Sequence, residues 1–167
     1  MKRKLNQPKV YVSVAILIMI ILFYSSSQTY AEQSSVSFLQ KWLSSEPFSN
    51  RLQSVAFDYG GTEVSIKAMG YYKFVEFFIR KAAHFFTFFI LGGSLFLVLN
   101  SKMKQSILSL MFAWFSATGY AAMDEFHQMI TGGRTPLFQD VMLDSMGALT
   151  ACVILVIYFE FGRKKSK

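Results

Sequence analysis

Cysteine, proline and histidine are scarce in this chain, which contains one, three and two of them among its 167 residues. The single cysteine, Cys152, cannot form an intramolecular disulfide, and its place inside an apolar run is typical of an inert packing residue. The sequence also lacks a nucleophile elbow, a phosphate-binding glycine loop and a cysteine–histidine pair. The common motif-defined enzyme classes are therefore absent, and the length leaves no room for a separate catalytic domain.

Long apolar runs are what the chain has in abundance, since 53% of its residues are hydrophobic and 17% are aromatic. A soluble domain of this size covers such residues with a comparable polar surface, so unbroken runs indicate that lipid is their solvent. We expect membrane spans at residues 10–24, 74–99, 107–130 and 136–161, with Thr135 as the N-cap of the last and Pro136 at its first helical position. The predicted fold is an all-α integral membrane protein, a bundle of about four transmembrane helices with one long extracytoplasmic loop.

The first apolar run is short for a span, which needs about 20 residues. Residues 29–31 are similar to a small-residue cleavage site, so a removed signal peptide is one interpretation. An uncleaved signal anchor is the preferred interpretation, because tilt and the serines that follow residue 24 supply the missing length.

Five regions follow from this pattern. They are a basic leader at 1–9, the anchor at 10–24, an extracytoplasmic loop at 25–73, a three-helix core at 74–161 and a basic tail at 162–167. The loop contains short amphipathic stretches, for which we expect one or two helices that lie along the membrane surface or form a lid. The sequence shows neither an internal repeat nor a matched pair of interrupted helices, the two features that would indicate a transporter.

Net charge is +7, yet the placement of the basic residues indicates topology and no nucleic-acid partner. They cluster before the first span, between the second and third, and after the last, as Lys2, Arg3, Lys4, Lys9, Lys102, Lys104, Arg163, Lys164, Lys165 and Lys167. Both termini are therefore expected in the cytoplasm. Lys73, Arg80, Lys81 and Arg134 depart from this rule because they fall near the outer ends.

Polar stripes occur at the outer ends of the last three predicted helices. Residues within a stripe are three or four apart, which places them on one helical face. The stripes are Glu76, Arg80 and His84; Asp124, His127 and Gln128; and Asp140 with Asp144. The connector at 132–136 is short, so the stripes are expected to meet at one membrane depth. The candidate ligand-binding residues are Arg80, Lys81, His84, Asp124, Glu125, His127, Gln128, Arg134, Asp140 and Asp144.

Each polar residue also has a purely structural interpretation, such as a helix-stabilising pair worth about 0.3 kcal/mol. His84 and Asp144 lie deeper, where an ionised group costs on the order of 3 kcal/mol by insertion scales, so the joint placement favours a site. Gly92-Gly93 and Gly147-Ala148 are expected where helices approach closely.

The residue types suggest two kinds of chemistry. Arg80, Lys81 and Arg134 suit a phosphate or carboxylate, since a guanidinium donates two parallel hydrogen bonds. A histidine beside a carboxylate suits general-base catalysis. The catalytic candidates are His84, Asp124 and His127. The spacing matches no metal-binding motif, and we expect neither a metal nor a cofactor.

At these residues the chain resembles the VanZ-like membrane protein family. The matching segments are Arg80-Lys81-Ala82-Ala83-His84-Phe85, Asp124-Glu125-Phe126-His127-Gln128 and Gly133-Arg134-Thr135-Pro136 with Asp140 and Asp144, and residues 23–28 also fit. Residues 32–73 carry no signature of the family. The resemblance implies a small multi-pass protein of the bacterial cytoplasmic membrane. The family is named for a member linked to resistance against teicoplanin, a glycopeptide antibiotic with a lipid tail.

Three functional interpretations remain open at this stage. The first is a non-enzymatic envelope protein that binds an anionic or amphiphilic ligand, such as a lipid-linked cell-wall component or a lipoglycopeptide. The second is a membrane-embedded enzyme acting on an envelope lipid head group, with His84 or His127 as base and the aspartates as orienting groups or metal ligands. The third is a structural bundle whose polar residues only bridge helices.

Overall fold

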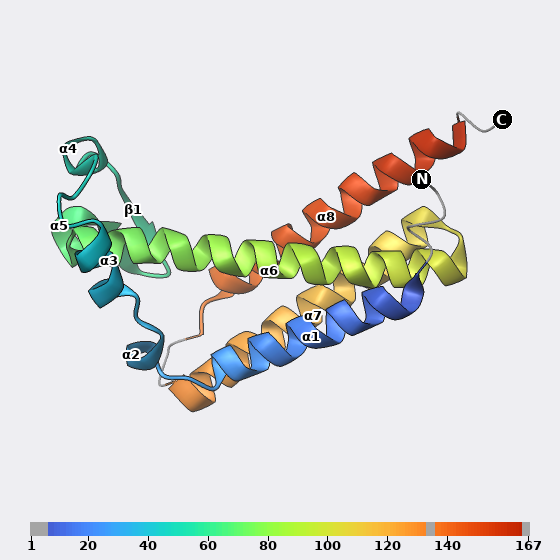
Figure 1. Ribbon diagram of the computed structural model, residues 1–167, viewed down its shortest axis with the longest axis horizontal. Coiled ribbons are helices and arrows are strands. Elements are labelled where there is room, and N and C mark those ends of the chain that lie inside the picture. Colours follow the sequence, from blue (N-terminus) through green and yellow to red (C-terminus); the bar gives the residue numbers. More distant parts are fainter. Residues whose placement is uncertain (1–6, 133–135, 165–167) are drawn as a thin grey trace.

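The computed structural model describes residues 7–132 and 136–164. Within these ranges four helices are long and apolar enough to cross a membrane: α1 (Pro8–Ser26), α6 (Tyr71–Met103), α7 (Ser106–Gly132) and α8 (Phe138–Lys164). They form an elongated bundle in which α1 and α7 run side by side and α8 crosses α6 (Figure 1). The prediction of an all-α membrane protein with about four spanning helices is confirmed.

The helices extend beyond the apolar runs that predicted them. α6 begins at Tyr71 and ends at Met103, instead of at residues 74 and 99, because polar and charged residues at both ends continue the helix. Lys104 follows in a left-handed conformation and donates its backbone N–H to the Asn100 carbonyl, which ends the helix. The 33 residues of α6 span roughly 50 Å, more than the about 30 Å of a hydrocarbon core, so its charged first turns reach the membrane boundary.

The predicted start of the last helix is wrong. Pro136 precedes α8, which begins at Phe138, and the predicted N-cap Thr135 lies outside the described residues. The physical reason is a hydrogen bond in which the backbone N–H of Leu137 donates to Glu125 Oε1 at 2.8 Å. This bond holds the end of the connector against α7, and the first turn of α8 forms only after it.

Glycine and alanine set the distance between α6 and α8. A Cβ on Gly92 would lie 2.7 Å from the Cα of Ala148, and a Cβ on Gly147 would lie 2.3 Å from the carbonyl oxygen of Phe85. The predicted close approaches are therefore confirmed, and the two backbones meet along the stretch that also carries the polar stripes. Buried alanines face the bundle from α7 in the same way, at Ala113, Ala117 and Ala121.

α1 packs as a member of the bundle. Ala15 and Leu22 are buried against α6 and α7, and the hydroxyl of Tyr120 donates to the Met19 carbonyl oxygen at 2.8 Å. Near the end of α1, Thr131 Oγ1 donates to the Ser26 carbonyl oxygen at 2.5 Å. These contacts are those expected of a retained anchor, whose retention stays a prediction.

The segment between α1 and α6 is more structured than expected. It contains α2 (Tyr30–Gln33), α3 (Val36–Trp42), α4 (Ser49–Leu52), β1 (Ala56–Tyr59), β2 (Thr62–Ser65) and α5 (Ile66–Met69). The strands form an antiparallel hairpin that pairs Ala56 with Ser65 and Tyr59 with Thr62. Two glycines with positive φ, Gly60 and Gly61, make its turn. The expectation of only one or two short helices missed this hairpin.

The two ends of the bundle differ in content. The start of α1, the connection from α6 to α7 and the end of α8 lie at one end (Figure 1). The short helices and the hairpin gather at the other end, around the first turns of α6. The hairpin also reaches α8, since the Tyr59 hydroxyl donates to Asp140 Oδ1, and a Cβ on Gly60 would lie 2.6 Å from a methyl carbon of Leu137, the residue before that helix. The polar stripes on α6 and α8 therefore lie beneath a covering segment, which agrees with the lid interpretation of residues 25–73 except for the hairpin.

Candidate functional site

A cavity of about 280 Å³ opens between α2, the hairpin, α6, α7 and α8. Its apolar lining residues are Val64, Met69, Phe77, Leu137 and Leu143. Its polar lining residues are Tyr30, Tyr59, Thr62, Lys73, Arg80, Lys81, His84, Glu125, Gln128, Asp140 and Asp144. Seven of the ten predicted ligand-binding residues are therefore brought to one cavity.

α6 contributes one continuous face to this cavity. Lys73, Phe77, Arg80, Lys81 and His84 recur at intervals of three or four residues and all line it. A helix with 3.6 residues per turn presents such positions on one side. The amphipathic first half of α6 thus places three cations and an imidazole along about three turns.

Lys81 and Asp140 join α6 to α8 at the mouth of the cavity. The Lys81 ammonium donates to Asp140 Oδ1, and the Tyr59 hydroxyl donates to the same oxygen at 2.5 Å. The ammonium also lies 4.7 Å from the centroid of the Tyr59 ring. Burial raises the pKa of the Tyr59 phenol, and the bond to Asp140 raises it further, so this hydroxyl remains a donor at neutral pH.

His84 and Asp144 form a second pair one turn further along the same helices. Nδ1 of His84 lies 3.3 Å from Oδ2 of Asp144. Asp144 is only 4% exposed, and its other oxygen, Oδ1, is buried without a hydrogen-bond partner among the described residues. Because a buried carboxylate oxygen without a partner is costly, this atom is an acceptor available to a group entering the cavity.

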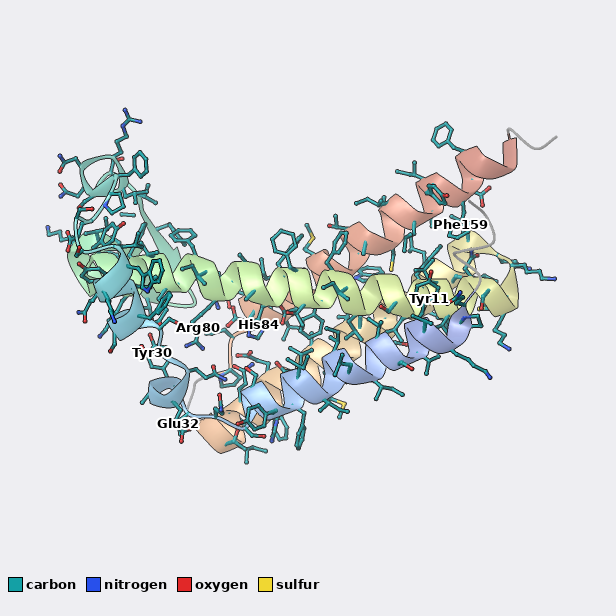
Figure 2. The ribbon with its side chains drawn as sticks, viewed as in Figure 1. Tyr11, Tyr30, Glu32, Arg80, His84 and Phe159 are labelled. Atoms are coloured by element: carbon teal, nitrogen blue, oxygen red, sulfur yellow. The ribbon has the colours of Figure 1, made fainter. Side chains whose placement is uncertain are left out.

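Arg80 is a cation of the cavity that no carboxylate of the described residues holds. Its guanidinium lies 4.8 Å from the centroid of the Tyr30 ring, and Nη2 donates to Gln33 Oε1 at 3.4 Å. Nη1 is buried without a partner, and no ion pair to Arg80 occurs among residues 7–132 and 136–164. Figure 2 shows Arg80 directed from α6 toward Tyr30, with His84 nearby on α6 and with Tyr11 and Phe159 at the opposite end of the bundle.

Glu76 anchors the cover to α6. Its side chain is 1% exposed and accepts hydrogen bonds from the Tyr30 hydroxyl at 3.1 Å and from the backbone N–H of Ser35. The carboxylate is therefore committed to α2 and the start of α3. Thr29 and Glu32 complete a capping box on α2, and the bonds from Thr29 lower the pKa of the exposed Glu32.

Glu125 and Gln128 line the cavity from α7, whereas two other predicted residues of that helix do not. Asp124 is buried and accepts a hydrogen bond from Gln128 at 2.9 Å, which confirms that these two share a face. His127 turns toward α1 instead. Its ring stacks on Phe23 with centroids 4.6 Å apart, and its Nδ1 lies 2.8 Å from Ser26 Oγ.

The remaining predicted residue, Arg134, lies outside the described residues. Four polar lining residues were absent from the predicted set: Tyr30, Tyr59, Thr62 and Lys73. Lys73 carried a signal, because it precedes Phe77 and Arg80 on the same face of α6. The two tyrosines carried none, since their positions depend on how the segment between α1 and α6 folds.

Metal binding receives no support from the arrangement. Across the part of the chain that the structure describes, no group of three or more histidine, cysteine, aspartate or glutamate side chains is placed to hold a metal ion. The acidic and imidazole groups of the cavity instead pair across α6 and α8, as Lys81 with Asp140 and His84 with Asp144. The described groups therefore suit polar recognition or proton transfer.

Comparison with known proteins identifies one family. The model of the VanZ/LLP1 family matches residues 11–159, which include all four membrane-spanning helices from α1 to α8 over most of their length. No curated protein and no solved structure matches the chain at a significant level.

Proposed function

Because the chain belongs to the VanZ/LLP1 family of membrane proteins, we propose that its cavity binds the anionic head group of an amphiphilic envelope molecule. The candidate ligand classes are a lipid-linked cell-wall component and a lipoglycopeptide. The proposal needs a cation for the head group, an apolar wall for the tail, and a cavity at the membrane boundary. Each of these has a counterpart among the residues that line the cavity.

The cation is Arg80, and its guanidinium is the single observation that carries the proposal. A buried N–H that donates to no atom of the described residues gains most from an acceptor in a ligand, because an unsatisfied buried donor costs about 1–3 kcal/mol. A phosphate or carboxylate is the acceptor that a guanidinium prefers. Lys73 and Lys81 line the same cavity and add positive charge beside Arg80.

The tail has an apolar wall to follow. Val64, Phe77 and Leu143 line the cavity together with the polar groups, so one ligand meets both kinds of surface. The cavity lies where the charged half of α6 gives way to its apolar half. This is the level at which a lipid in the bilayer keeps its head group, so an amphiphile is better matched than a soluble anion.

The outer face of the bacterial cytoplasmic membrane is the proposed location of the cavity. The basic residues Lys102 and Lys104 lie at the other end of α6, and the start of α1 and the end of α8 share that end. Basic residues favour the cytoplasmic side. Single-cysteine labelling at Ser45 and at Ser101 with an impermeant reagent tests this, since only Ser45 should react in intact cells.

The binding experiment uses purified full-length protein in non-ionic detergent, with short-chain phosphatidylglycerol and phosphatidylethanolamine as probes in native mass spectrometry. Arg80→Gln should weaken the binding of both lipids about tenfold or more, because a charge-assisted bond to phosphate is lost. Arg51→Gln is the matched control, since it removes an exposed arginine from α4. Equal affinities of Arg80→Gln and wild type, or no saturable binding of either lipid, would contradict the proposal.

Protection against teicoplanin is the finer form of this proposal. A sensitive host expressing the protein should resist teicoplanin more than vancomycin, which lacks the lipid tail. Arg80→Gln and Asp144→Asn should lose that protection at equal membrane abundance, measured by immunoblot. Protection that persists in both variants would mean that the cavity is not responsible for resistance to the antibiotic.

A membrane-embedded enzyme acting on a lipid head group is the second candidate, and the contact between His84 and Asp144 favours it. A carboxylate beside an imidazole orients the ring and stabilises the imidazolium that forms after the neutral ring, acting as a general base, has accepted a proton. An enzyme should lose head-group turnover in His84→Ala while its lipid affinity stays within about twofold of wild type. A protein that only binds should show no turnover in wild type.

A further inference from the structure

The charges around the cavity balance. Its lining contains three basic side chains, Lys73, Arg80 and Lys81, and three acidic ones, Glu125, Asp140 and Asp144. Counted over the described lining residues, with His84 neutral, the formal charges therefore sum to zero. A purely anionic head group meets like charge at the three carboxylates, whereas a ligand that also carries a positive charge gains from them. The head group that matches this lining carries both signs.

Two buried atoms show where the opposite signs belong. Nη1 of Arg80 is a donor without an acceptor, and Oδ1 of Asp144 is an acceptor without a donor. Both residues line the cavity, and Asp144 is only 4% exposed. Neither atom satisfies the other, although their charges are opposite. The cavity thus offers a ligand one hydrogen-bond donor, on Arg80, and one acceptor, on Asp144.

The two positions lie at different depths along the bundle. Arg80 is four residues before His84 on α6, a rise of about 6 Å along the helix axis, and His84 in turn contacts Asp144. A phosphate and an ammonium joined by a short aliphatic linker span such a distance. Glu125 lines the cavity from α7, which adds a third carboxylate to those of Asp140 and Asp144.

Building on the proposed function, we infer that the ligand is a zwitterionic amphiphile whose phosphate binds Arg80 and whose N–H-bearing ammonium binds Asp144. Phosphoethanolamine-type head groups have this chemistry. A quaternary ammonium has the same charge but no N–H to donate, so it satisfies the electrostatics and leaves Oδ1 of Asp144 without a hydrogen bond. A glycerol head group supplies the phosphate and hydroxyl donors but no positive charge.

The experiment compares three short-chain lipids on the purified full-length protein: phosphatidylethanolamine, phosphatidylcholine and phosphatidylglycerol. Wild type should bind phosphatidylethanolamine about tenfold more tightly than either of the others, as expected for one charge-assisted hydrogen bond. Asp144→Asn should bring the three affinities close together, and Glu63→Gln on the exposed hairpin edge is the control. Free phosphoethanolamine should compete more weakly than the lipid; equal competition would overturn the amphiphilic ligand, because the apolar wall would then contribute nothing to binding.

The outcomes separate this inference from the proposed function. Phosphatidylglycerol that binds as tightly as phosphatidylethanolamine, with both weakened by Arg80→Gln, would overturn the zwitterionic ligand and leave anionic binding standing. Equal affinity for phosphatidylcholine would overturn the hydrogen bond to Asp144. Failure of all three lipids to bind saturably would overturn both proposals. The comparison within wild type keeps the inference testable even where a variant fails to fold.

Discussion

Gly147 of α8 lies against the backbone of Phe85 in α6, so closely that a Cβ atom on the glycine would come within 2.3 Å of the Phe85 carbonyl oxygen. Phe85 follows His84 directly, and Gly147 lies three residues after Asp144. The close approach therefore fixes the register in which His84 meets Asp144 and, one turn away, Lys81 meets Asp140. The packing of α6 against α8 at this glycine thus determines which charged side chains pair across the cavity.

Gly147→Ala should destabilise the bundle. The added methyl group meets backbone, which cannot rotate away, so α6 and α8 must separate at a cost of about 1–3 kcal/mol. The thermal midpoint in detergent, followed by circular dichroism, measures the loss. Gly119→Ala is the control, because no atom lies within 4 Å of the position of its added Cβ and alanine favours the helix. A Gly147→Ala protein as stable as wild type would contradict the close approach.

His127 should prove structural. His127→Ala removes its stacking on Phe23 and its contact with Ser26, which together join α7 to α1, so stability should fall by about 1–2 kcal/mol. His127→Phe retains the stacking and should fall by less. Lipid affinity of the folded fraction should equal that of wild type in both variants. A folded His127→Ala protein that no longer binds lipid would return this residue to the site.

The membrane-spanning helices were predictable because the physics that defines them is local. The length and hydropathy of an apolar run suffice to predict a span. The glycines at 92 and 147 likewise indicated where α6 and α8 approach closely. The ends were less predictable, since the charged first turns of α6 are helical without being apolar. The hairpin did carry a signal, a pair of glycines between Tyr59 and Thr62, which is typical of a tight turn.

The site was predictable only where one helix sets the geometry. Arg80, Lys81 and His84 share a face by their spacing, and Asp140 and Asp144 do so on α8. Periodicity does not decide which neighbour a residue faces when two helices flank it. His127 for this reason contacts α1, whereas Gln128, one residue later, lines the cavity. Tyr30 and Tyr59 enter the site through tertiary contacts that no local pattern encodes.

High pH should release the hairpin from α8. The pKa of Tyr59 is raised by burial and by its bond to Asp140, so its contribution to stability is fully present below the ordinary tyrosine pKa of about 10. That contribution is lost as pH rises through the raised pKa, because the phenolate cannot donate to Asp140. The difference absorbance spectrum between wild type and Tyr59→Phe during alkaline titration isolates this group. Ionisation of Tyr59 at or below pH 10 would contradict the buried hydrogen bond.

Glu76 should hold the cover of the cavity in place. Its buried carboxylate accepts from Tyr30 and from the backbone of Ser35, so Glu76→Ala leaves α2 and α3 without their anchor on α6. Trypsin measures the release, because Lys41 and Arg51 are exposed in the covering segment and cleavage there follows the population of the open form. Loss of two hydrogen bonds to a carboxylate, each worth about 1.5–3 kcal/mol, should raise the cleavage rate at least about tenfold.

Tyr30→Phe refines this test, since it removes one hydrogen bond and keeps an aromatic ring beside Arg80. Its cleavage rate should lie between those of wild type and Glu76→Ala, whereas Tyr24→Phe, an exposed position on α1, should cleave like wild type. Lipid-binding kinetics test whether this segment controls access to the cavity. If it does, Tyr30→Phe should speed both association and dissociation of lipid while changing the equilibrium affinity little. Cleavage of Glu76→Ala at the wild-type rate would mean that other contacts hold the segment, and Val64 of β2, which is 2% exposed, is then the residue to substitute next.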